Sequence, residues 1–303
     1  MKNTGVGSVI RKQWQLFVFL APALIYIIIF HYLPMYGIII SFQNYKPSLG
    51  VLGSKFVGLA NFKRFFNLPN FKNIFLNTLF LSLYNIAVSF PLPVILALSL
   101  NRIGNGKFKK TVQTITYAPH FISTVVVVGI VFILLSPNSG MFNNVITAFG
   151  GEKVFFMGKP EYFRHIYVWS GVWQSMGWGS IIYLAAISSV DTSLYESAAI
   201  DGASLIQQVR YIDIPCIMPT IIIQLILSAG RMLNVGFEKV LLLQNSLNIE
   251  TSEVISTYVY KAGLIKNQYG FSSAIGMFNS VINFIILLIV NKLAKKAGHG
   301  GLF

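Results

Sequence analysis

Long apolar windows with almost no charge dominate this sequence. Six windows run over residues 16–42, 74–100, 112–135, 166–190, 217–235 and 273–291, and Arg231 is their one charged residue. Each reaches the roughly 18 residues that a helix needs to cross a bilayer. None shows the alternating polarity of barrel strands, and backbone groups in lipid must hydrogen-bond internally. The windows therefore predict an all-α membrane protein with six transmembrane helices.

The composition also fits a lipid environment. Of 303 residues, 54% are hydrophobic and only 11% are charged, whereas soluble domains carry about 25% charged residues. The net charge is +14, from 23 Lys and Arg against 9 Asp and Glu. These basic residues lie between the apolar windows, where anionic lipid attracts them. We expect membrane lipid, and no nucleic acid, among the partners.

The distribution of basic residues predicts the topology. An even number of spans places both termini on one side, but inner and outer segments carry equal numbers of basic residues under either orientation. The local density of basic residues distinguishes the two orientations, because charges close to span ends have the largest effect on topology. Residues 102–110 hold four basic residues in nine positions, and Lys292, Lys295 and Lys296 follow the last window. We expect a multi-pass protein of the cell membrane with both termini cytoplasmic and residues 46–72 outside.

The first outer segment interleaves phenylalanines with basic residues between Phe56 and Phe66. Such a segment can lie in the membrane interface with its rings in lipid and its charges in water. It can equally form a small extracellular cap packed on the helices. The sequence leaves both interpretations open.

Signatures of catalysis and nucleotide binding are missing from the sequence. It contains no G-x-x-x-x-G-K-[ST] phosphate loop, no H-E-x-x-H and no G-x-S-x-G. Its one cysteine, Cys216, cannot form an intrachain disulfide or a cysteine zinc site. Apart from Arg231, the windows lack the ionisable residues that mark proton and ion pathways. We therefore expect no enzyme activity, metal or bound cofactor, and an energy source outside the chain.

The loop between the fourth and fifth windows is polar and acidic. Ser193 and Glu196 have the spacing of a capping box that opens a helix. Gly202 suits the positive φ of a helix C-terminus. A second short helix is expected from Ala203, with an apolar face of residues at i, i+4 and i+7. The segment 191–216 therefore predicts a helix–turn–helix with a small, acidic tip.

This loop resembles the EAA loop of permeases from binding-protein-dependent ABC importers. The family pattern is E-A-A, then Gly three residues on, then nine residues and I-x-L-P. Here Glu196-Ser197-Ala198, Gly202 and Ile212-Asp213-Ile214-Pro215 match it, with Ser197 for Ala and Ile214 for Leu. Residues 21–24, 56–62 and 31–37 resemble the carbohydrate-uptake branch, and the last segment is similar to permeases for complex and uronate-containing oligosaccharides.

The resemblance implies a type I ABC importer permease, with one transmembrane domain over 1–303, a core of about 74–291 and a cytoplasmic coupling loop at 191–216. It also implies a second homologous permease, two cytoplasmic ATPase subunits that hold ATP and Mg, and an extracytoplasmic solute-binding protein. The expected function is oligosaccharide import by alternating access. The residues implied to couple the permease to the ATPase are Glu196, Ser197, Ala198, Ala199, Asp201, Gly202, Ala203 and Pro215.

Two other functional classes are possible for such a composition. A stand-alone secondary transporter or channel would need its own coupling site, and inverted repeats are common in secondary transporters. A membrane-embedded hydrolase would need a nucleophile constellation. The sequence shows neither feature.

A sugar path requires aromatic faces and amide or hydroxyl groups in an apolar channel. We expect Arg231 to bind a carboxylate or several hydroxyls, since a guanidinium can bind such groups in a bidentate manner. It could instead pair with Glu238 or extend to the interface. The candidate path residues are Tyr84, Asn85, Trp169, Trp173, Gln174, Trp178, Arg231, Asn234, Asn279 and Asn283.

Overall fold

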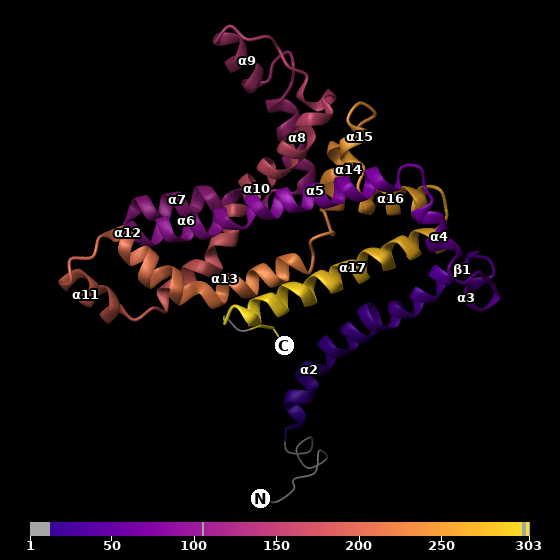
Figure 1. Ribbon diagram of the computed structural model, residues 1–303, viewed down its shortest axis with the longest axis horizontal. Helices are drawn as coiled ribbons and strands as arrows, with labels where there is room; N and C mark the ends of the chain where they lie inside the picture. Colours follow the sequence, from indigo (N-terminus) through magenta and orange to yellow (C-terminus); the bar gives the residue numbers. More distant parts are fainter. Residues whose placement is uncertain (1–12, 105, 299–300, 303) are drawn as a thin grey trace, which may run out of the picture. The chain divides into compact units, whose positions relative to one another are not determined.

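The computed structural model describes residues 13–104, 106–298 and 301–302, and the chain divides into two compact units (Figure 1). One unit comprises residues 1–67 and 261–277, and the other comprises 68–260 and 278–303. Lys2, Arg11 and Lys12, which contribute to the predicted charge balance, lie outside the described residues.

The first unit contains an apolar N-terminal helical segment and a small cap. Asn61 Nδ2 donates to the carbonyls of Ser41, at 2.9 Å, and Gln43, at 3.0 Å. Phe65 is fully buried, and the Arg64 guanidinium lies 4.2 Å from the Phe271 ring centroid. These contacts favour the cap over the interfacial interpretation. The elements are α2 (Trp14–Ile27), η1 (Ile28–Tyr32), η2 (Leu33–Phe42), β1 (Gln43–Asn44), α3 (Gly50–Gly53), β2 (Lys55–Phe56), α4 (Ala60–Phe66), η6 (Lys261–Ile265) and the start of α17 (Tyr269–Lys296).

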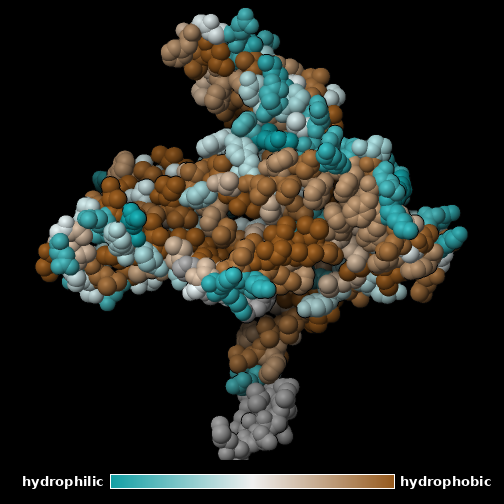
Figure 2. Space-filling model, viewed as in Figure 1, coloured by the Kyte–Doolittle hydropathy of each residue, from teal (hydrophilic) through white to brown (hydrophobic). Residues whose placement is uncertain are grey.

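The second unit is a helical body. In Figure 2 its long helices present a broad hydrophobic surface, and hydrophilic side chains become frequent around α11. Its elements are α5 (Phe71–Ser89), α6 (Pro91–Arg102), α7 (Lys107–Tyr117), η3 (Ala118–Phe121), α8 (Thr124–Leu134), α9 (Met141–Ala148), η4 (Phe156–Gly158), α10 (Pro160–Ser188), α11 (Thr192–Ile200), α12 (Leu205–Gln208), η5 (Val209–Asp213), α13 (Ile214–Ala229), α14 (Phe237–Leu243), α15 (Ile249–Ser252), α16 (Ile255–Tyr260) and the rest of α17.

Each of the six predicted windows falls on a helical segment. Four segments of the described chain are long and apolar enough to cross a membrane: Trp14–Phe42, Phe71–Arg102, Leu205–Ala229 and Tyr269–Lys296. A fifth is the pair Lys107–Phe121 and Thr124–Leu134, if the two helices form one span. The remaining window lies on α10, whose 29 residues extend about 44 Å at 1.5 Å per residue. Serine, glutamine and tyrosine residues make α10 less apolar.

Two predicted spans differ from the structure. The third is not a straight helix, because the chain bends by 105° between η3 and α8. Pro119 opens η3 and Ser123 caps α8, so the regular α-helical hydrogen bonding is interrupted there. The fifth predicted span runs to residue 235, but α13 ends at Ala229 and a turn follows. Arg231 therefore lies in that turn and not on the helix.

Helix α10 lies at the centre of the second unit and packs against α5, α6, α7 and α13. Two of its glycines permit this close packing. A Cβ at Gly177 would overlap the backbone of Thr116 in α7, and a Cβ at Gly179 would lie 3.3 Å from Pro93 in α6. Small residues of this kind let helix backbones approach within a membrane.

Gly177→Ala should lower the thermal unfolding temperature of the purified transporter, because the new methyl group separates α7 from α10. Overpacking of this kind costs about 1–3 kcal/mol. Gly129→Ala in α8 is the control, since a Cβ there meets no atom within 4 Å. Equal unfolding temperatures for Gly177→Ala and the wild type would contradict the packing argument.

Candidate functional site

The loop after α10 starts and ends its first helix with local hydrogen bonds. The Asp191 carboxylate caps α11 by accepting from the Ser193 backbone N–H at 2.9 Å, and this hydrogen bond lowers the pKa of Asp191. At the other end, Gly202 has φ +75°, and the N–H groups of Gly202 and Ala203 donate to the carbonyls of Ala199 and Ala198 at 3.1 and 2.8 Å. This is a Schellman motif, and it confirms the prediction that Gly202 ends the first helix with a positive φ.

The predicted capping box lies at the wrong pair of residues. Asp191, and not Ser193, caps α11, so Glu196 is left exposed within the helix. A capping box does form at the second helix, where Ser204 N–H donates to Gln207 Oε1 at 2.7 Å and Gln207 N–H donates to Ser204 Oγ at 3.4 Å. Asp191 directly precedes the first residue of α11, so its carboxylate is placed to accept from the Ser193 N–H.

The residues of the E-A-A pattern lie on an accessible tip. Glu196, Ser197, Ala199, Asp201 and Gly202 are exposed, and Ala198 and Ala203 are half-buried. Ile200 is 87% exposed between them, and Ile206 on α12 is 80% exposed. Pro215 lies in the first turn of α13 and is exposed. The tip therefore combines an acidic rim with large apolar side chains.

A buried ion pair joins this loop to the end of α6. Asp213, fully buried in η5, pairs with Arg102, whose other terminal nitrogen donates to Gln208 Oε1 at 2.8 Å. The Tyr195 hydroxyl on α11 donates to the second oxygen of Asp213 at 2.5 Å. Burial and the Asp213 charge raise the pKa of Tyr195 to about 12, so this donor keeps its proton at neutral pH. One carboxylate thus connects α6, α11 and η5.

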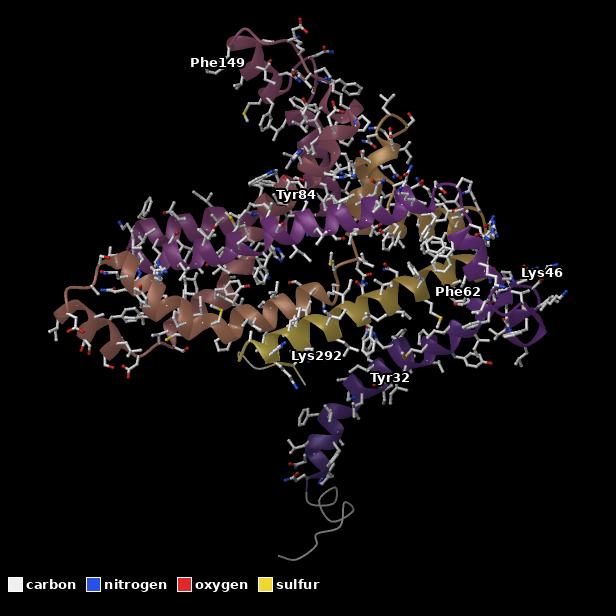
Figure 3. The ribbon with its side chains drawn as sticks, viewed as in Figure 1. Tyr32, Lys46, Phe62, Tyr84, Phe149 and Lys292 are labelled. Carbon is white, nitrogen blue, oxygen red and sulfur yellow. The ribbon has the colours of Figure 1, made fainter. Side chains whose placement is uncertain are left out.

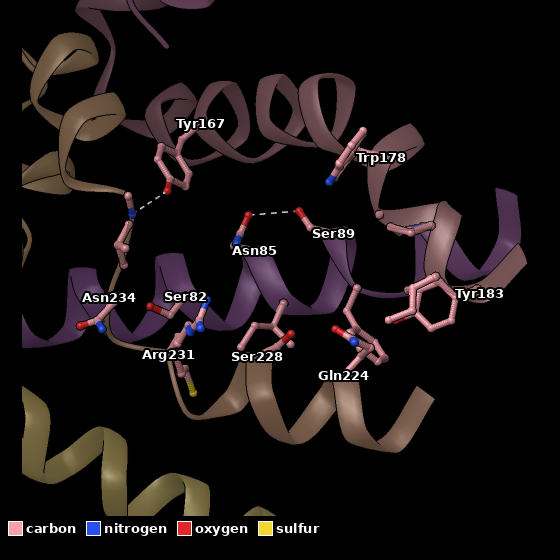
Figure 4. A pocket seen from close by; sticks show the side chains of 18 residues that line it. Ser82, Asn85, Ser89, Tyr167, Trp178, Tyr183, Gln224, Ser228, Arg231 and Asn234 are labelled. Carbon is pink, nitrogen blue, oxygen red and sulfur yellow. Dashed lines mark hydrogen bonds between the residues drawn. The ribbon is translucent and has the colours of Figure 1, made fainter. Parts of the chain in front are cut away.

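A cavity of about 510 Å³ lies between α5, α10 and α13 (Figure 4). Helices α5 and α13 supply polar side chains spaced three or four residues apart, and α10 supplies Tyr167, Trp178 and Tyr183. In Figure 4 the α5 side chains Asn85 and Ser89 are hydrogen-bonded to each other and point toward the side on which Tyr167 and Trp178 of α10 lie. The polar and aromatic lining residues are Ser82, Asn85, Ser89, Tyr167, Trp178, Tyr183, Gln224, Ser228, Arg231 and Asn234.

Arg231 brings an uncompensated positive charge to this cavity. It is exposed in the turn after α13, and no carboxylate of the described residues forms an ion pair with it. Pairing with Glu238, one of the sequence-based alternatives, does not occur in this structure. The guanidinium can therefore offer its donors to a molecule in the cavity.

Asn234 is held in place by two residues of α17. Asn279 Nδ2 and Asn283 Nδ2 both donate to Asn234 Oδ1, at 2.8 and 3.1 Å, and Asn283 Oδ1 accepts from the Leu233 N–H at 2.9 Å. Asn279 and Asn283 do not line the cavity. They position the segment that carries Asn234.

Three candidate path residues lie apart from this cavity. Tyr84 hydrogen-bonds to His165 Nδ1 at 2.8 Å and accepts from Trp169 Nε1 at 3.1 Å, and Figure 3 shows its place on α5. Trp169 and Trp173 are exposed. None of the three lines either cavity.

Gln174 and Trp178 hold the bend of the third span. Gln174 Nε2 donates to the Ile122 carbonyl at 2.9 Å. The Trp178 ring stacks on His120 with centroids 4.6 Å apart, and Phe121 meets its edge at 5.5 Å. Gln174 also lines a second cavity, so these two residues contact both the bend and the polar space.

The second cavity, of about 390 Å³, shares four lining residues with the first: Asn85, Ser89, Tyr167 and Gly236. It adds Thr124, Gln174, Glu238 and the buried Lys239. The sequence analysis missed Lys239 because it lies beyond the predicted end of the fifth span. It also missed Ser82, Ser89, Gln224 and Ser228, although their helical spacing from Asn85 and Arg231 was a usable signal.

Comparison with known proteins decides the family. Residues 89–299 match the model of the binding-protein-dependent transport system inner membrane component. The chain belongs to this family. It is therefore an ABC importer permease of the inner membrane, as the sequence predicted, and not a stand-alone transporter or a hydrolase.

Similar proteins cover almost all of this permease. It is 45% identical over 96% of its length, and 91% of the relative, to the polygalacturonan/rhamnogalacturonan transport system permease protein YteP of Bacillus subtilis. It is 41% identical over 97% of its length, and 92% of the relative, to Protein LplB of the same organism.

The fold matches a solved transporter. The permease superimposes with a TM-score of 0.88 and 40% identity on a chain of a bacterial ABC transporter involved in the import of the acidic polysaccharide alginate. The match covers 96% of this chain and 98% of that one. A structure of a bacterial alginate ABC transporter in complex with alginate pentasaccharide-bound periplasmic protein gives a TM-score of 0.90 at 39% identity, covering 98% and 99%. These matches confirm the predicted type I permease fold.

Tyr195→Phe should reduce sugar import by several-fold while the ATPase remains bound. The change removes one hydrogen bond to a charged group, worth about 1.5–3 kcal/mol, and loosens α11 from η5. The measurement is sugar imported per ATP hydrolysed in proteoliposomes. Tyr211→Phe, at an exposed position on the same segment, is the control. Unchanged import by Tyr195→Phe would show that this contact does not transmit motion.

Proposed function

We propose that this permease carries acidic oligosaccharides, with uronate sugars as the substrate class, across the membrane by alternating access. The observation that carries the proposal is Arg231, a guanidinium without an acidic partner in a cavity otherwise lined by hydroxyl, amide and aromatic groups. Such groups bind the hydroxyls and ring faces of sugars, and a guanidinium binds a carboxylate through paired hydrogen bonds. The similar transporters support the same class, because polygalacturonan and alginate, after which two of them are named, are polymers of acidic sugars.

Within this cavity we assign substrate contact to Asn85, Trp178, Arg231 and Asn234, with Gln174 in the adjoining cavity. Their exposure to the two cavities supports this assignment. Tyr84, Trp169 and Trp173 remain candidates for an outer part of the path, because Trp169 donates to Tyr84 and both tryptophans are exposed. Asn279 and Asn283 act on the substrate only through Asn234.

The permease works, in this proposal, with a second homologous permease, two cytoplasmic ATPase subunits and an extracytoplasmic binding protein. ATP and Mg are bound by the ATPases. The family description, which names binding-protein-dependent transport, supports the binding protein. The chain serves as one permease domain over 1–303, with its core at about 74–291.

The tip of the coupling loop is the proposed docking surface for an ATPase. Glu196, Ser197, Ala198, Ala199, Asp201, Gly202 and Ala203 form it, and Pro215 starts the helix that carries motion onward. Ile200 fits this role as an apolar anchor, because a side chain that is 87% exposed gains most from burial in a cleft. The Arg102–Asp213 pair then connects the docked helix to α6 and α13.

The proposed topology places this end of the second unit in the cytoplasm, together with both termini. Arg102 contacts Gln208 and Asp213, so the basic segment 102–110 and the coupling loop share one end of the helices. That shared position supports the positive-inside prediction.

Gly202→Trp should abolish import while the chain still inserts, because a bulky residue with positive φ is strained and blocks the docking surface.

Ile200→Asp should weaken ATPase binding by about tenfold, through loss of about 1.4 kcal/mol of apolar burial. Co-purification of the ATPase measures its binding to each variant, and sugar uptake in proteoliposomes measures import. Leu52→Asp, at a highly exposed leucine outside the loop, is the control. Normal ATPase binding and import in both loop variants would refute the docking surface.

Arg231→Gln should lower uptake of an acidic oligosaccharide by about tenfold, the loss expected for one charge-assisted contact of about 1.4 kcal/mol. Uptake of a matched neutral oligosaccharide should change little. Equal loss of both substrates would make Arg231 a structural residue, and no loss of either would remove it from the path. Lys266→Gln, which removes an exposed charge in the other unit, is the control.

A further inference from the structure

Lys239 is a basic side chain in a buried position. A residue with only a structural role at such a position is normally neutral. Lys239 lies in α14 and is 8% exposed. Its Nζ donates to the Tyr167 carbonyl at 3.1 Å and lies 5.1 Å from the centroid of the Tyr167 ring. A buried ammonium group costs free energy unless it is paired, so this position calls for a compensating anion.

No carboxylate of the described residues supplies that anion. Lys239 forms no ion pair within 4.0 Å among the described residues. Glu238 is adjacent in sequence and lines the same cavity, but it is exposed and does not pair with Lys239. Burial lowers the pKa of Lys239 to about 8, which still leaves most of the ammonium protonated at neutral pH. One carbonyl uses one of its three N–H donors, and two remain.

The surroundings leave space around this ammonium group. Lys239 lines the second cavity, opposite the α10 residues Gly171 and Gln174. A Cβ at Gly171 would lie 3.3 Å from Lys239 Nζ, so glycine keeps that approach open. The second cavity shares Asn85, Ser89, Tyr167 and Gly236 with the cavity of Arg231. Two cations without acidic partners therefore line two adjoining polar spaces.

We propose that Lys239 is a second carboxylate-binding side chain of the translocation path and receives a uronate group of the same oligosaccharide that Arg231 binds. The inference rests on the proposed function. A purely structural role, in which Lys239 only attaches α14 to α10 through the Tyr167 carbonyl, would need one neutral donor. It would not need a charge whose desolvation opposes folding. A carboxylate in the cavity uses the two free donors and compensates the charge.

The test uses the complete transporter in proteoliposomes, with trigalacturonate delivered by saturating binding protein. Lys239→Met keeps the length and apolar stem of the side chain and removes the charge. It should lower trigalacturonate imported per ATP hydrolysed by about tenfold, the loss expected for one charge-assisted contact. Lys239→Arg should restore at least half of the wild-type ratio. Lys266→Met removes a charge at an exposed position of the other unit and should leave the ratio unchanged.

Wild-type sugar per ATP in Lys239→Met would overturn the inference. So would a parallel loss of ATP hydrolysis and import in both Lys239 variants, since that pattern marks a structural role. If Lys239→Met does not assemble, Gly171→Ala crowds the ammonium group while keeping it, and an unchanged ratio there would also overturn the inference. A wild-type transporter that imports no trigalacturonate would instead refute the proposed substrate class, and the assignment of Lys239 would fall with it.

Discussion

The bilayer dictates the architecture because it provides no hydrogen-bond partners. Backbone groups are therefore paired within helices, and side chains that carry polar groups gather where helices face one another. Helix α10 meets this requirement with glycine at its closest contacts, where Gly177 lies against Thr116 and Gly179 against Pro93. The approach of neighbouring backbones leaves polar faces of α5, α10 and α13 around one cavity. A polar cavity within an apolar chain is the consequence.

The sequence revealed the parts of this fold that depend on local rules. Apolar windows located the helices, and the spacing from Glu196 to Pro215 predicted the loop that we propose as the coupling loop, including the positive φ of Gly202. The cap of α11 was misassigned, because Asp191 and Ser193 both satisfy the preference for an N-cap and only the structure shows which hydrogen bond forms. The end of the fifth span was missed because apolar residues continue through the turn after Ala229.

The site was harder to predict because tertiary contacts decide which polar residues face a cavity. Four of the predicted residues face the cavity: Asn85, Trp178, Arg231 and Asn234. Asn279 and Asn283 instead donate hydrogen bonds to Asn234. The helix faces Ser82–Asn85–Ser89 on α5 and Gln224–Ser228 on α13 follow the 3.6-residue period and could have been predicted from the sequence. Lys239 could not, because its burial depends on α14 packing against α10.

The coupling loop and the cavity are connected through α13. Its start is fixed by the Asp213 carboxylate, which Arg102 and Tyr195 hold, and its end leads into the turn that carries Arg231. Displacement of α11 by an ATPase would pull on Asp213, because a buried ion pair resists separation. A rigid α13 would carry that displacement toward the cavity. The ligand can bias the two states of the transporter only through a difference in affinity between them. Arg231, in the turn after α13, would provide such a difference for an acidic sugar, since its distance from the α5 and α10 groups would change as α13 moves.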